Sequence, residues 1–137
     1  MSRDVVVVSG VRTAIGTFNG GLKDIAPSDL AARVVKEALA RAKVDPNTVG
    51  HLYLGNVIHT EPKDMYISRL ACINGGLPHT TAALTVNRLC GSGMQAIVSA
   101  AQSILLGDTD AAVGGGAESM TRGGYLTPSA RWGARMG

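Results

Sequence analysis

Short apolar runs that alternate with longer amphipathic segments constrain the fold of this chain most. Val5–Val8, four β-branched residues, end at Ser9-Gly10 and predict a strand that is buried on both faces. Further strands are predicted at His51–Gly55, Ala83–Leu89 and Ala111–Gly115. Strands that alternate with helices at this spacing favour right-handed crossovers and a parallel sheet. The sequence therefore predicts an α/β fold, a βαβαβαβ layer of mostly parallel strands covered by helices.

Three helices are predicted between these strands. The first begins at Pro27, with Ser28 as its N-cap, and the second spans Met65–Asn74. The third, Gly93–Leu106, is the clearest, and Gly107 follows its end. Its large apolar side chains recur at helical spacing and form a stripe along one side of the helix. The stripe consists of Met94, Ile97, Val98, Ala101, Ile104 and Leu105.

Composition narrows the class of protein further. Hydrophobic residues make up 45% of the 137 and charged residues 17%, which suits a packed core and argues against disorder. The net charge of +3 comes from scattered basic residues, and aromatic residues are only 4%, so nucleic-acid binding is disfavoured. Two cysteines without metal-ligand spacing argue against a metal site and fit a reducing compartment. The N-terminal apolar run is too short for a signal peptide or a membrane span, so we expect a cytoplasmic protein that binds no membrane.

The segment between the third predicted strand and the next helix carries the chief chemical candidate. Its residues Cys90-Gly91-Ser92-Gly93 place a thiol in a sharp turn at a helix N-terminus. Unpaired backbone N–H groups and the helix dipole favour an anion there, and therefore the thiolate. Gly91 and Gly93 support the turn because they carry no side chain that would block a substrate from the sulfur. This is the logic of a nucleophile elbow, with sulfur in place of a hydroxyl.

Two other interpretations of this turn stay open on the residues alone. A lone cysteine beside an apolar strand is more often a buried packing residue than a nucleophile. The pattern Gly91-x-Gly93-x-x-Ala96 also matches a dinucleotide-binding fingerprint, with Glu118 as the acidic residue beyond the next strand. Against the fingerprint, such a motif normally follows the first strand of its unit, and this one follows the third.

Three segments in a fixed order carry a family resemblance: Val8–Phe18, Asn87–Ala96 around Cys90, and Gly114–Thr121. They resemble segments of the thiolases, the family of acetyl-CoA acetyltransferases and 3-ketoacyl-CoA thiolases, and above all the bacterial biosynthetic and β-ketothiolase type. The resemblance covers essentially the whole chain, and it displaces the dinucleotide-binding interpretation.

The resemblance implies covalent chemistry at Cys90. The thiolate would attack an acyl-CoA, expel coenzyme A and hold the acyl group as a thioester. A second acetyl-CoA would then attack this group in a Claisen condensation, of which thiolysis is the reverse. In the family, the backbone N–H of this cysteine helps to form an oxyanion hole. The resemblance implies acetyl-CoA and other acyl-CoA thioesters as substrates, no cofactor, and a homodimer or homotetramer at full length.

The same resemblance implies that the chain is the N-terminal part of a longer enzyme. Residues 1–120 would form most of the N-terminal domain, and residues 121–137 would begin the segment that leads into an inserted loop domain. The family's Asn-Glu-Ala-Phe, Gly-His-Pro and Cys-x-Gly motifs do not occur in the sequence. We therefore expect an acyltransferase in the full-length parent and an inactive structural or interaction fragment as the isolated chain. A ketoacyl synthase-like condensing enzyme is a further alternative.

The remaining polar candidates have structural interpretations. The three histidines, His51, His59 and His79, are expected to be solvated or capping residues, and Cys72 to pack within an apolar helix. Glu118 is expected to be a paired, partly buried carboxylate that supports the Cys90 loop. We expect Arg12 and Arg88 to be buried ion-pair partners, or Arg88 to lie at a subunit contact.

Overall fold

A parallel sheet forms the centre of the molecule. The computed structural model describes residues 4–133, 135 and 136. The strands are β1 (Val49–Gly55), β2 (Ala82–Val86) and β3 (Ala111–Gly116). Their order is β2-β1-β3, and β1 pairs in parallel with both neighbours. Gly55 is level with Val86 of β2 and with Gly116 of β3, so the three strands end at one edge of the sheet.

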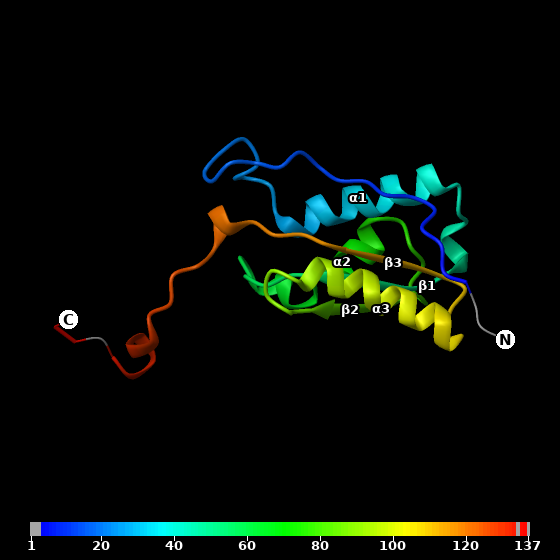
Figure 1. Cartoon of the computed structure of the whole chain (residues 1–137). Helices are drawn as coiled ribbons and strands as arrows, with labels where there is room; N and C mark the ends of the chain where they lie inside the picture. The colour runs from blue at the N-terminus through cyan, green and yellow to red at the C-terminus, as the bar shows by residue number, and fades with distance from the viewer. Residues whose placement is uncertain (1–3, 134, 137) are drawn as a thin grey trace.

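Helices cover both faces of this sheet, as Figure 1 shows. The helices are α1 (Pro27–Ala42), α2 (Ile67–Asn74) and α3 (Ser92–Leu106). Short 3-10 turns lie at Pro46–Thr48, Pro62–Tyr66, Met120–Arg122 and Pro128–Trp132. α1 and α2 pack on one face and α3 on the other. The connection from β1 to β2 through α2 and the connection from β2 to β3 through α3 run in opposite directions along the sheet, so right-handed crossovers place these two helices on opposite faces. The segment after Met120–Arg122 extends away from the sheet towards the C-terminus.

The central strand β1 is buried on both faces, and it divides the core into two clusters. Leu52 and Leu54 point to the side of α1 and α2, where they join the larger cluster. Tyr53 points to the other side and packs with Ala96 and Ala100 of α3. Successive side chains of a strand point to opposite faces, so a strand with helices on both sides is apolar throughout.

Most of the predicted elements are confirmed. The strands predicted at His51–Gly55 and Ala111–Gly115 correspond to β1 and β3, and the helices correspond to α1, α2 and α3. The strand predicted at Ala83–Leu89 ends earlier, at Val86. The N-cap prediction for α1 is wrong, since Ala26 is the N-cap and Ser28 is buried in the first turn. Pro27 occupies the first helical position, where its missing N–H costs no hydrogen bond.

The strand predicted at Val5–Val8 is wrong, and the described sheet has three strands rather than four. The segment has no strand partner in the described part of the chain, and Val6, Val7 and Val8 are 73%, 85% and 66% exposed. An apolar β-branched sequence becomes a strand only where a neighbour satisfies its backbone N–H and C=O groups. The α/β class and the parallel sheet covered by helices are confirmed.

The apolar stripe of α3 does not face the sheet. Its large apolar side chains lie on the outer face, with Met94 67% and Leu105 53% exposed. The residues that face the sheet are small: Ser92, Ala96, Ala100 and Ser103. Periodicity finds the apolar stripe of a helix, but a sheet that presents glycines accepts the stripe of small residues instead.

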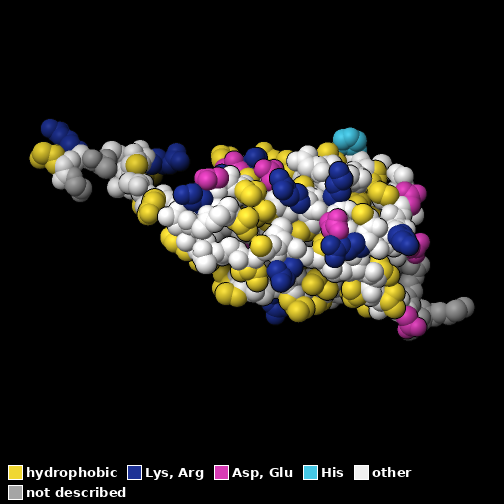
Figure 2. All heavy atoms as spheres, turned by 90° about the horizontal axis from the view of Figure 1, so that it is seen from above, with side chains coloured by type: hydrophobic (Ala, Val, Ile, Leu, Met, Phe, Trp, Pro, Cys, Tyr) yellow, Lys and Arg dark blue, Asp and Glu magenta, His cyan; other side chains and the backbone are white. Residues whose placement is uncertain are grey.

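The segment Leu89–Leu106 is also long and apolar enough to cross a membrane, with a mean hydropathy of 1.3 and 22% of the segment buried. Core helices of soluble proteins meet the same criterion, so it is weak evidence for a membrane span. Seen from above (Figure 2), acidic and basic side chains are interspersed over the surface, in line with the scattered charge in the sequence.

Candidate functional site

The turn that carries Cys90 lies between the end of β2 and the start of α3. Cys90 is exposed, and Gly91 is the N-cap of the helix that begins at Ser92. This places the thiol where the sequence predicts it, at a helix N-terminus on the carboxyl edge of the parallel sheet. In open parallel sheets this edge is where ligands bind, because strand ends and helix N-termini meet there.

The side chain of Ser92 closes this turn by binding the backbone before the cysteine. Its Oγ accepts a hydrogen bond from the backbone N–H of Arg88 at 2.8 Å and donates one to the carbonyl oxygen of Leu89 at 2.6 Å. The Gly91 N–H also donates to the Arg88 carbonyl oxygen at 3.1 Å. Ser92 therefore holds the two residues that precede Cys90 in place.

Leu89, directly before Cys90, has a φ of 51°. This is the left-handed region, which residues other than glycine seldom adopt and which occurs often at functional sites. The Leu89 N–H donates to Oδ1 of Asn87 at 3.0 Å, which offsets part of the cost of this conformation. At Gly93 an added Cβ would meet no atom within 4 Å, so this position leaves the space beside the turn open.

A second polar arrangement joins the ends of the three strands. The N–H of Asn56, the residue after β1, donates to the Val86 carbonyl oxygen at the end of β2 at 3.1 Å. The Asn56 amide Nδ2 donates to the carbonyl oxygen of Ala117, just beyond β3, at 2.9 Å. Asn56 is 1% exposed, so these bonds are formed in a dry environment, where an unpaired donor is costly.

Glu118 belongs to this arrangement. Its carboxylate accepts hydrogen bonds from the N–H groups of Val57 and Ile58, each at 2.9 Å, and from Nδ2 of Asn56 at 3.2 Å. The Glu118 carboxylate is hydrogen-bonded as expected, but it is exposed rather than partly buried. Its partners belong to residues 56–58 and not to the Cys90 turn. Glu118 thus fastens the loop after β1 to the exit of β3.

Replacing Glu118 by alanine is expected to accelerate amide hydrogen exchange at Val57 and Ile58 by about three- to tenfold. A hydrogen bond to a charged acceptor contributes on the order of 1.5–3 kcal/mol when buried, and less at an exposed carboxylate such as this one. The measurement is exchange followed by mass spectrometry of the peptide that contains residues 56–60, with Glu118→Gln as the control that keeps an acceptor oxygen. Unchanged exchange in Glu118→Ala would show that the carboxylate does not hold the loop.

The two arginines are not buried ion-pair partners. Arg12 and Arg88 are both exposed. Arg12 donates to the carbonyl oxygen of Thr13, and Arg88 donates to Oε1 of Gln95 in the first turn of α3. The Arg88 side chain therefore contributes to the outside of the Cys90 turn.

The second cysteine, Cys72, is confirmed as a packing residue of α2. It is 0% exposed and belongs to the larger core cluster. Burial raises the pKa of the Cys72 thiol, and the neighbouring Arg69 only partly opposes this effect. Cys72 is therefore protonated and inaccessible at neutral pH, whereas Cys90 is open to solvent.

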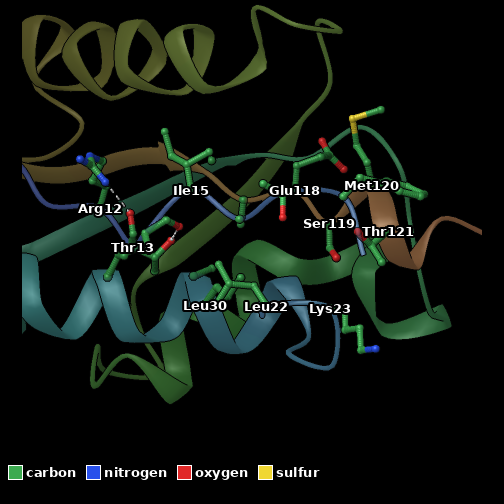
Figure 3. Close-up of a pocket in the computed structure, with 18 of the residues that line it drawn as sticks. Arg12, Thr13, Ile15, Leu22, Lys23, Leu30, Glu118, Ser119, Met120 and Thr121 are labelled. Atoms are coloured by element: carbon green, nitrogen blue, oxygen red, sulfur yellow. Dashed lines mark hydrogen bonds between the residues drawn. The ribbon is translucent and has the colours of Figure 1, made fainter. Parts of the chain in front are cut away.

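A cavity of about 610 Å³ lies away from the Cys90 turn. Figure 3 shows side chains of the N-terminal segment, α1 and the exit of β3 around it, among them Arg12, Ile15, Leu30 and Glu118. Sequence patterns did not indicate this cavity, because segments far apart in the chain form its walls. Cys90 is not among its lining residues, and the described residues contain no group of three or more His, Cys, Asp or Glu side chains that could hold a metal ion.

The sequence of this chain is similar to sequences of known thiolases. The sequence model described as "Thiolase, N-terminal domain" matches residues 5–137. Beta-ketothiolase BktB of Cupriavidus necator is 71% identical over 137 residues, which is 100% of this chain and 35% of that protein. The mitochondrial 3-ketoacyl-CoA thiolase of Homo sapiens is 39% identical over 135 residues, which is 98% of this chain and 34% of that protein. The chain thus spans about a third of the length of these relatives.

Solved structures of acetyl-CoA acetyltransferases and 3-ketoacyl-CoA thiolases contain the fold of this chain. The acetyl-CoA acetyltransferase of Bacillus anthracis superimposes with a TM-score of 0.93 at 40% identity, covering 99% of this chain and 34% of that one. Human mitochondrial 3-ketoacyl-CoA thiolase in complex with CoA superimposes with a TM-score of 0.91 at 39% identity, covering 96% of this chain and 33% of that one. The match of the family model over residues 5–137, together with these relatives, shows that the chain belongs to the thiolase family and corresponds to its N-terminal domain.

Proposed function

We propose that the complete polypeptide containing this chain is an acyl-CoA C-acetyltransferase in which Cys90 is the nucleophile. The observation that carries the proposal is the exposed Cys90 thiol beside the N-terminus of α3, at the carboxyl edge of the sheet. A helix N-terminus stabilises a thiolate, which is the nucleophilic form of cysteine. Relatives named acetyl-CoA acetyltransferase and 3-ketoacyl-CoA thiolase support acyl-CoA thioesters as the substrates.

In the proposed reaction, the sulfur of Cys90 attacks the carbonyl carbon of an acyl-CoA. A new C–S bond forms to Cys90, the C–S bond to coenzyme A breaks, and coenzyme A leaves as a thiolate that is then protonated. Loss of a proton from the α-carbon of acetyl-CoA produces a carbanion, which attacks the acyl carbon and releases Cys90. Thiolysis of a 3-ketoacyl-CoA runs through the same bonds in the opposite direction.

Each attack produces an oxyanion, which needs hydrogen-bond donors. We propose the backbone N–H of Cys90 as one donor, since it lies in the turn at the start of α3. Within the described part of the chain, no histidine and no second cysteine is hydrogen-bonded to the residues of this turn. Cys72 is buried on the other face of the sheet. The groups that transfer protons are therefore proposed to lie in the two-thirds of the relatives' length that this chain does not span.

Incubation of the complete polypeptide with acetyl-CoA is expected to acetylate Cys90. Peptide mass spectrometry would locate the acetyl group, and Cys72 serves as an internal control because its thiol is buried. An acetyl group on Cys72 alone, or no acetylated cysteine, would contradict the proposal. Prior treatment with iodoacetamide is expected to block acetylation by alkylating Cys90 first.

The proposal for the isolated 137-residue chain is different. We propose that it is an inactive structural or interaction fragment, because the proton-transfer groups are outside it. Residues 1–120 would be most of the N-terminal domain and residues 121–137 the start of the connection to an inserted domain. Measurable thiolysis of acetoacetyl-CoA by the isolated chain would contradict this. A cytoplasmic homodimer or homotetramer stays the prediction for the complete protein.

A further inference from the structure

The N-terminal half of α3 rests on the sheet through glycines, without side chains between the two backbones. An ideal Cβ on Gly55, the last residue of β1, would lie 2.5 Å from the carbonyl carbon of Ser92 and 2.7 Å from the Gly93 nitrogen. An ideal Cβ on Gly114 of β3 would lie 2.7 Å from Cα of Ile97. Separations below 3.0 Å do not occur between real Cβ atoms and backbone, so a side chain at either position forces the helix to shift.

The requirement at Gly55 concerns space and not backbone conformation. Among the described glycines, a positive φ occurs only at Gly76, Gly107 and Gly133, so Gly55 has a conformation that alanine also adopts. The atoms that a Cβ would meet are backbone atoms of Ser92 and Gly93 and the Cβ of Ser92, none of which is the end of a flexible side chain. The C-terminal end of β1 thus determines how closely the first turn of α3 approaches the sheet.

A chain of contacts leads from Gly55 to the cysteine. Gly55 sets the position of Ser92, as the preceding distances show. The Ser92 hydroxyl in turn holds the Arg88 N–H and the Leu89 carbonyl oxygen, which precede Cys90. A displacement of Ser92 therefore moves the backbone of Arg88 and Leu89, and with it the sulfur of the next residue, Cys90.

From this geometry we infer that Gly55 and Ser92 are positioning residues for Cys90. They act through the turn and touch no reacting atom. The inference deepens the proposed function, since it assumes that the Cys90 thiol is the reactive group. A misplacement of about 1 Å at a reacting group can cost on the order of 100-fold in rate.

The test is the rate of Cys90 alkylation by iodoacetamide in the complete polypeptide, measured from pH 6 to pH 10 and read out by peptide mass spectrometry. Gly55→Ala is expected to change this rate at least about threefold and to change its pH profile, because the clash moves the sulfur relative to the first turn of α3. Gly115→Ala is the matched control on β3, where an added Cβ meets nothing within 4 Å, and it is expected to behave as the unmodified protein.

A second comparison separates positioning from loss of stability. Gly114→Ala creates a clash of similar severity, but at Ile97 in the second turn of α3 and away from Ser92. It is expected to lower the melting temperature about as much as Gly55→Ala does while it changes the alkylation profile less. Equal effects of the two variants on the profile would overturn the inference.

Ser92→Ala tests the same chain of contacts without any steric demand and serves if Gly55→Ala does not fold. It removes both hydrogen bonds of the hydroxyl, and we expect it to change the alkylation profile in the same way as Gly55→Ala does. An unchanged profile in Ser92→Ala would overturn the inference. If these profiles change but acetyl-CoA never labels Cys90, the positioning role of Gly55 and Ser92 is supported and the acyl-transfer proposal fails. If Cys90 is acetylated while the profiles stay unchanged, the acyl-transfer proposal is supported and the positioning role fails.

Discussion

Replacement of Cys90 by alanine is expected to lower the rate of acetoacetyl-CoA thiolysis by the complete polypeptide at least about 1,000-fold. Removal of the covalent nucleophile of a hydrolytic enzyme can lower kcat by on the order of 10⁶-fold. The physical reason is that no other described thiol is exposed: Cys72 is 0% exposed in the core. Without the Cys90 sulfur the acyl group has no carrier, and the two-step transfer cannot begin. The measurement is the loss of the acetoacetyl-CoA absorbance in the presence of coenzyme A.

Cys72→Ala is the matched control for this experiment. It removes a thiol of the same type from the core, where it creates a small cavity, and the expected result is a lower melting temperature with turnover largely retained. Comparable loss of turnover in the two variants, or full turnover in Cys90→Ala, would contradict the assignment of the nucleophile. Circular dichroism of each variant establishes that the fold is retained.

The second large effect concerns stability. Leu52→Ala is expected to lower the free energy of unfolding by about 2–5 kcal/mol. Leu52 is 0% exposed at the middle of the central strand, and it contributes to the cluster that joins β1 to α1 and α2. The deletion leaves a cavity that strands paired on both sides cannot close, because β1 is hydrogen-bonded to β2 and β3.

Urea denaturation followed by circular dichroism measures this change. Leu126→Ala is the matched control, because the same atoms are removed from a side chain that is 93% exposed, and a change within about 0.5 kcal/mol is expected. A loss of less than 1 kcal/mol in Leu52→Ala would show that the larger cluster does not carry the stability of the sheet.

The position of the Cys90 turn could be predicted because its sequence signal is local. A strand that runs into a Gly-rich turn and then an apolar helix is specified by consecutive residues, and the structure places Cys90 at the start of α3 as expected. The role of Cys90 stays a prediction. The alternative that it is a buried packing cysteine is wrong, since the residue is exposed.

The partners of Glu118 and the two arginines were not predictable in the same way. Glu118 is bound by residues about sixty positions earlier in the chain, and only the parallel pairing of β1 with β3 brings them together. Arg12 and Arg88 were expected to be buried ion-pair partners, with a subunit contact as the alternative for Arg88. The structure leaves both exposed, with hydrogen bonds to neutral oxygens.

By itself, the sequence determined the α/β class, the helices, three strands and the position of the candidate nucleophile, because these depend on spacing along the chain. Only the tertiary structure decided which helix face is buried and whether an apolar run is a strand. The outward face of α3 follows from Gly114 and Gly116 on β3, which admit small residues closely. Val5–Val8 has the composition of a strand but no paired neighbour in the described part of the chain. Strand pairing and close approach are properties of two segments at once, and periodicity describes only one.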